Sequence, residues 1–95
     1  MVVFLWNHSW DDPADDAVSE RVGREAIKEL EAYARSIGKA NPFVFLNYAD
    51  RSQNPLAGYG PDNVRRIREA SLKYDPRQVF QYLVPGGFKI SSVPK

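Results

Sequence analysis

The stretch Met1-Val-Val-Phe-Leu-Trp-Asn-His-Ser-Trp10 decides the predicted fold class, because β-branched and aromatic residues dominate it. Such residues favour extended backbone, so the stretch is predicted to be a β-strand. Side chains alternate between the two faces of a strand, which puts Trp6, His8 and Trp10 on one face. The first half of the stretch is apolar on both faces, and we expect it to be covered on both sides.

A second strand is predicted over Phe43-Val-Phe-Leu-Asn-Tyr48, which follows a break in the pattern at Asn41-Pro42. Phe45 and Asn47 share one face of this strand, and Tyr48 lies on the other. The polar, glycine-containing residues 49–60 are predicted to be a loop. Two strands rarely form a stable sheet alone. Either the helices carry the core, or another chain completes the sheet.

Between the two strands the sequence predicts a long amphipathic helix. The run Asp11-Asp-Pro-Ala-Asp-Asp16 suits a helix start, and apolar residues then recur at steps of three and four as far as Ile37. Gly38 ends this helix. A second helix is predicted from Pro61 to Tyr74, and Asp75 is expected to cap a short turn after it.

The predicted fold class is therefore α+β. It comprises a small antiparallel sheet, one long amphipathic helix, a second shorter helix and an irregular C-terminal tail from Pro85.

Length, charge and composition exclude several classes of protein. The chain has 95 residues, a formal net charge of +1 and no cysteine. We therefore expect one domain, no nucleic-acid partner, and neither disulfides nor zinc–thiolate sites. The longest apolar run, Val2–Trp6, is too short to span a bilayer and lacks the features of a signal peptide, so no membrane partner is expected. The acidic residues 11–16 are interpreted as helix capping, and no metal site is predicted.

Three groups of polar residues are candidates for chemistry. His8 is the only histidine, and its neighbour Ser9 points to the opposite strand face, so a half-buried structural histidine is favoured over a catalytic triad. The arginines at 65, 66 and 68 are interpreted as a solvated helix face. Asn47 and Tyr48 close an apolar strand, and on the residues alone they are a strand end.

Several separated motifs resemble the C-terminal segment of berberine-bridge-enzyme-like oxidases, and the resemblance covers nearly the whole chain. The upstream part, with the long helix, is similar to the last strand and helix of the substrate domain of these enzymes. The residues that carry the resemblance are His8-Ser-Trp-Asp-Asp-Pro-Ala-Asp-Asp16, Asn41-Pro-Phe-Val-Phe-Leu-Asn-Tyr-Ala-Asp50, Tyr59-Gly60, Asn63, Arg66, Tyr74-Asp75-Pro76, Val79-Phe80 and Pro85-Gly-Gly-Phe-Lys89.

The resemblance implies FAD-linked oxidation on a vanillyl-alcohol-oxidase type fold. In that family a Y-x-N-Y motif closes the active site beside the flavin, and its second Tyr deprotonates the substrate while hydride passes to the flavin. Tyr48 takes the position of that catalytic Tyr, and Asn47 takes the Asn, which we assign to cofactor binding. Phe45 replaces the first Tyr and loses its hydroxyl. Phe45, Trp6 and His8 are assigned to substrate binding.

Nothing in the chain resembles the family's N-terminal FAD-binding domain, so the isolated chain is not expected to bind FAD. Residues 1–95 are interpreted as a single domain of the family's C-terminal type. Residues 1–40 would form the end of the substrate-domain strand and helix, and residues 41–95 the C-terminal motif segment.

Two functions follow from the resemblance and remain open at this point. The chain is part of, or derived from, an FAD-dependent oxidoreductase and contributes a substrate-side wall with Tyr48. Alternatively, it is a non-catalytic binding or assembly module derived from such an oxidase. The expected partners are a second copy in a homodimer or a flavin-binding chain, with a small apolar ligand as a further candidate. The sequence does not indicate a compartment.

Overall fold

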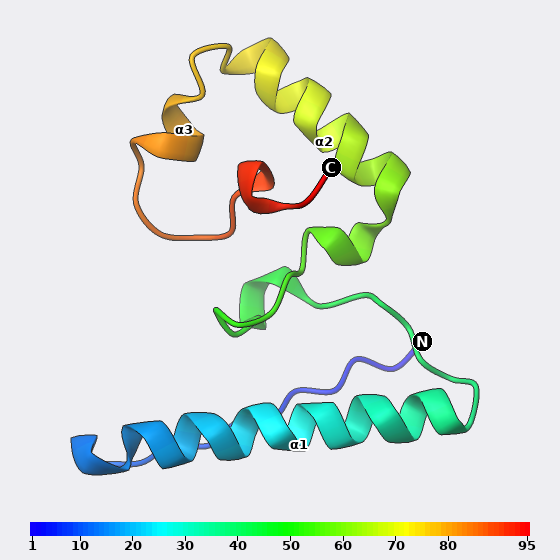
Figure 1. Cartoon of the computed structure of the whole chain (residues 1–95), viewed down its shortest axis with the longest axis vertical. Helices are drawn as coiled ribbons and strands as arrows, with labels where there is room; N and C mark the ends of the chain where they lie inside the picture. Colours follow the sequence, from blue (N-terminus) through cyan, green and yellow to red (C-terminus); the bar gives the residue numbers. More distant parts are fainter. The chain divides into compact units, whose positions relative to one another are not determined.

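The computed structural model describes all residues, 1–95, and contains helices and no β-strand. Its α-helices are α1 (Asp16–Ser36), α2 (Pro61–Tyr74) and α3 (Val79–Tyr82), labelled in Figure 1. Short 3₁₀ helices lie at Pro13–Asp15, Leu46–Tyr48, Ala57–Tyr59 and Ile90–Ser92. None of the helices has the length and apolar character needed to cross a bilayer.

The predicted α+β fold with an antiparallel sheet is wrong, because neither predicted strand forms. Residues 1–10 carry no regular secondary structure and make no backbone–backbone hydrogen bonds. The second predicted strand is extended only as far as Phe45, and Leu46–Tyr48 then turns into a 3₁₀ helix. A strand is stabilised by hydrogen bonds to a neighbouring strand, and no pair of strands forms within this chain.

The chain divides into two compact units, Met1–Asn41 and Pro42–Lys95. Each unit is held by its own contacts. The prediction that residues 1–95 form one domain of the resembled type stays a prediction.

In the first unit the predicted long helix is confirmed. The Asp12 carboxylate accepts a hydrogen bond from the amide of Ala14 at 2.9 Å, and Pro13 opens the first turn, as the capping pattern indicates. The helix ends before Gly38, whose φ of +68° is the left-handed conformation that favours glycine. The N-terminal segment contacts α1 through His8, and no side chain of residues 1–41 is fully buried.

In the second unit α2 begins and ends at the predicted residues. Gly60, at φ +87°, turns the chain into Pro61, and Asp75 follows the last turn. The Asp75 carboxylate accepts hydrogen bonds from the amides of Val79 and Phe80, both at 2.9 Å, which confirms the predicted cap of the short turn α3. Val64 near the start of α2 is buried, whereas Tyr74 at its end is exposed.

The core of the second unit forms between α2 and the C-terminal tail. Val64, Ile90 and Val93 are its buried side chains, and Leu56 and Ile67 pack against them. The tail was predicted to be irregular, yet it supplies two of these three residues, Ile90 from the turn at Ile90–Ser92 and Val93 directly after it. Figure 1 shows this last turn beside α2.

Candidate functional site

Phe45, Asn47 and Tyr48 lie together at one turn of the second unit. The 3₁₀ helix Leu46–Tyr48 is closed by a hydrogen bond from the amide of Tyr48 to the carbonyl of Phe45 at 3.1 Å. This turn brings the two rings edge to face, with centroids 5.2 Å apart and an angle of 74° between the ring planes. Tyr48 is 67% exposed, and Asn47 is also exposed. The turn therefore presents a phenol and an amide to solvent.

The extended residues before this turn are anchored on the 3₁₀ helix Ala57–Tyr59. The Phe43 ring packs edge-on against Tyr59, with centroids 6.0 Å apart. The carbonyl of Pro42 lies so close to Gly58 that a Cβ on Gly58 would be 2.4 Å from the oxygen. A side chain at position 58 cannot be accommodated without moving the backbone at Pro42. Gly58 and Tyr59 thus hold the segment that leads to Tyr48.

Trp6 and His8, the other predicted site residues, lie in the first unit beside α1. The indole Nε1 of Trp6 donates a hydrogen bond to Nδ1 of His8 at 2.9 Å, and Nε2 of His8 is 3.0 Å from the carbonyl oxygen of Ser19. The Trp10 ring packs on His8 at 5.2 Å between centroids. Both ring nitrogens of His8 are therefore engaged within the unit.

The structure thus brings the predicted site residues together as two sets, one in each unit. The first set is Trp6 and His8; the second is Phe45, Asn47 and Tyr48. No group of three or more His, Asp or Glu side chains is arranged to hold a metal ion.

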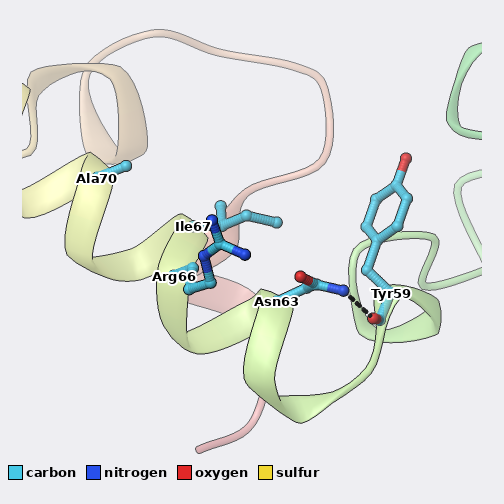
Figure 2. Close-up of a pocket in the computed structure, with 5 residues that line it drawn as sticks. All are labelled: Tyr59, Asn63, Arg66, Ile67 and Ala70. Carbon is cyan, nitrogen blue, oxygen red and sulfur yellow. Dashed lines mark hydrogen bonds between the residues drawn. The ribbon is translucent and has the colours of Figure 1, made fainter.

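A shallow depression of about 490 Å³ on α2 was not predicted as a site. It is lined by Tyr59, Asn63, Arg66, Ile67 and Ala70, and the Asn63 amide donates a hydrogen bond to the Tyr59 carbonyl at 3.0 Å (Figure 2). Figure 2 shows the Tyr59 ring standing at one end and the Arg66 side chain lying along the helix. The steps of four from 59 to 63 and 67 are a usable signal, but residues 49–60 were predicted to be a loop, and Tyr59 was named only as part of the family resemblance.

Two arginines of α2, Arg65 and Arg68, make different kinds of interaction. Arg65 forms ion pairs with Asp62 at 3.0 Å and with Glu69 at 3.9 Å, which fits the predicted solvated face. Arg68 departs from that prediction, because its guanidinium is half-buried and donates hydrogen bonds to the carbonyls of Val93 and Pro94. Arg68 therefore fastens the tail to α2.

The turn at Leu46–Tyr48 places two hydrogen-bonding groups, a phenol and an amide, beside an aromatic ring. A phenol oxygen can donate or accept a hydrogen bond, an amide can do both at separate atoms, and the Phe45 ring offers apolar contact. These groups can orient a ligand with a hydroxyl or carbonyl beside its reacting carbon. When the phenol is deprotonated to a phenolate, the Tyr48 oxygen can also accept a proton.

The chain is similar to segments of curated FAD-dependent monooxygenases. The FAD-dependent monooxygenase drtC of Aspergillus calidoustus is 50% identical over 93 residues, which cover 98% of this chain and 18% of drtC. The FAD-dependent monooxygenase sdcF of Emericella nidulans is 49% identical over 85 residues, or 90% of this chain and 18% of sdcF. The bifunctional solanapyrone synthase of Alternaria solani is 44% identical over 87 residues, or 92% of this chain and 17% of that protein.

The chain spans less than a fifth of the length of these relatives. Its homologues are thus FAD-dependent monooxygenases, of which it matches a small part, and this supports a link to FAD-dependent oxidoreductases. No family model matches the chain. No solved structure matches it either.

Proposed function

We propose that this chain contributes the substrate-side wall of an FAD-dependent oxidoreductase of the berberine-bridge-enzyme-like type. The observation that carries the proposal is the exposed Tyr48 phenol, which the turn at Leu46–Tyr48 holds against Phe45. The similarity to FAD-dependent monooxygenases supports the chemical class. In this role Tyr48 accepts the proton that the substrate loses on oxidation, and Asn47 faces the cofactor from the same turn.

The geometry of the turn suits a proton acceptor that must meet a substrate. The edge-to-face contact with Phe45 fixes the tilt of the Tyr48 ring, while 67% of the residue stays accessible. A general base has to come within hydrogen-bonding distance of the proton that it removes, so an accessible oxygen on a fixed ring is favourable. Phe45 carries no hydroxyl and therefore provides apolar contact only.

The residues of this chain do not fit FAD by themselves. A flavin dinucleotide is commonly held by backbone N–H groups at a helix N-terminus, where the helix dipole favours the pyrophosphate. The first turn of α1 follows Asp12 and Asp15 and begins at Asp16, which repel an anion. At the start of α2, Pro61 has no N–H to donate, and the Asp62 carboxylate lies in the first turn, where it opposes an anion. The proposal therefore places the FAD in polypeptide outside this chain.

We expect a tagged form of the chain, purified from the organism that encodes it, to carry flavin absorbance through a flavin-holding polypeptide. The same chain purified alone should show no saturable quenching of FAD fluorescence, because it offers the pyrophosphate no suitable backbone. Unfolded chain serves as the control for nonspecific quenching. Micromolar FAD binding by the isolated chain would contradict the proposal that the FAD is held outside this chain. Protein purified from the native organism without flavin absorbance would contradict the enzymatic role.

A second candidate function is a non-catalytic assembly module. The observation that favours it is the apolar face of α1, on which Val18, Val22 and Tyr33 are all about half exposed or more. These residues recur at helical spacing, so they form one continuous stripe. An exposed apolar stripe of this kind marks an interaction surface. The sheet that was expected to extend across a dimer does not form, but this stripe is available for a second copy.

We expect the isolated chain to form a homodimer at micromolar concentration, with the α1 stripe in the interface. Val22→Asp should convert the dimer to the monomer, since it places a charge in the middle of the stripe. Ala17→Asp is the matched control, because position 17 lies on the opposite face of α1. Light scattering measures both variants. A 10.8 kDa monomer for the unmodified chain would refute the dimer.

A further inference from the structure

Both tryptophans and the only histidine of the chain form one cluster on α1. His8 lies between Trp6 and Trp10, with ring centroids 6.3 Å and 5.2 Å away. On the helix side, the cluster meets Gly23, where a Cβ would lie 3.0 Å from Cε1 of His8 and 3.8 Å from Trp6. The missing side chain at Gly23 therefore lets the N-terminal segment approach the helix.

The hydrogen bonds of His8 give each ring nitrogen a different role. An indole Nε1–H is a donor only, so Nδ1 of His8 must accept from Trp6 through a lone pair. The proton of a neutral ring then resides on Nε2, which donates it to the carbonyl oxygen of Ser19 at 3.0 Å. The docked arrangement thus uses one acceptor and one donor of a neutral imidazole. A protonated imidazole has two donors and no acceptor.

We propose that His8 is a pH-sensitive latch that holds the N-terminal segment on α1 and releases it in acid. Protonation places a second N–H at Nδ1, opposite the Trp6 N–H at 2.9 Å, so that two donors face each other. The bond to Ser19 survives protonation, whereas the bond to Trp6 does not. Trp6 then leaves the cluster together with residues 1–5, which no backbone hydrogen bond retains.

The direction of the pH dependence follows from the same geometry. The released segment leaves Nδ1 free to take a proton, and the docked segment blocks it, so a falling pH favours release. The charged groups on the adjoining turns of α1 are Asp16, Glu20 and Arg24. Glu20 and Arg24 pair with each other at 3.3 Å, and Asp16 accepts a hydrogen bond from the Trp10 indole at 2.6 Å. Each of these three groups already has a partner in the unit.

The two tryptophans make the latch directly measurable in the isolated chain. Nuclear magnetic resonance resolves their indole N–H signals, and Trp10→Phe assigns them. Between about pH 8 and pH 5, where an imidazole takes up its proton, the Trp6 signal should move to the position of a solvent-exposed indole. The Trp10 signal is the internal control, because its indole donates to the Asp16 carboxylate and not to the imidazole.

His8→Gln removes the titrating group and should leave the Trp6 signal unchanged across the same pH range. In a Trp10→Phe background, the fluorescence of the remaining Trp6 gives a second readout and should shift to longer wavelength in acid. The latch is refuted if the Trp6 signal is constant in the unmodified chain, or if the Trp10 signal also moves to the position of a solvent-exposed indole. It is also refuted if His8→Gln shows the same shift. The inference does not depend on the proposed oxidoreductase role.

Discussion

Tyr48→Phe is expected to lower the turnover of the flavin-containing assembly by about 10²–10⁴-fold, the usual contribution of a general base. The substitution removes only the phenol oxygen. It leaves the ring, and with it the 5.2 Å edge-to-face contact with Phe45, in place. The fold, the flavin absorbance and the affinity of the assembly should therefore persist. The measurement is the rate of flavin reduction by substrate in a single turnover.

Tyr82→Phe is the matched control for this experiment. Tyr82 is 73% exposed, similar to Tyr48, but it lies on α3 and has no assigned role. Its substitution should leave the rate of flavin reduction unchanged. If Tyr48→Phe retained full turnover while the assembly kept its flavin, proton removal would belong to a group outside this chain. The homology to FAD-dependent monooxygenases would stand in that case, and the role of Tyr48 would not.

The helices could be predicted from the sequence because their determinants are local. Asp12 and Pro13 open the first helical turns, and Asp75 caps α3, through bonds to residues no more than five positions away. Apolar spacing of three and four then follows one helix face. These caps and this spacing depend only on residues close in the sequence and need no contact with the rest of the fold. The bounds of α1 and α2 therefore agree closely with the prediction.

The strands could not be predicted in the same way, since a strand depends on a partner. Alternation in Met1–Trp10 describes which side chains would share a face of a strand, whereas Trp6, His8 and Trp10 lie near one another on a segment without regular structure. It does not supply the neighbouring backbone that a sheet requires. In the segment after Pro42, the i to i+3 hydrogen bond that closes Leu46–Tyr48 replaces strand pairing.

The candidate site was predictable only where its residues are close in the sequence. Phe45, Asn47 and Tyr48 share one turn, so a motif could identify them together. The contacts that support this turn join residues further apart, such as Pro42 with Gly58 and Phe43 with Tyr59. No periodic pattern connects these pairs. The same holds for Arg68, whose bonds to the tail carbonyls span 25 and 26 residues.

Ile90→Ala is expected to unfold much of the second unit, because this unit depends on very few buried side chains. Ile90 is 5% exposed and packs with Val64 and Val93. Truncation of a buried isoleucine costs about 2–5 kcal/mol. A unit of this length has a total stability of only about 3–8 kcal/mol, at 0.05–0.15 kcal/mol per residue. Hydrogen exchange of the backbone amides of α2 measures the loss.

Leu83→Ala provides the matched control, since Leu83 is 75% exposed and its truncation removes little buried surface. Protection of the α2 amides should fall in Ile90→Ala and persist in Leu83→Ala. The amides of α1 should be unaffected by either substitution, because α1 belongs to the first unit. Equal protection of α2 in both variants would mean that the tail does not hold the core.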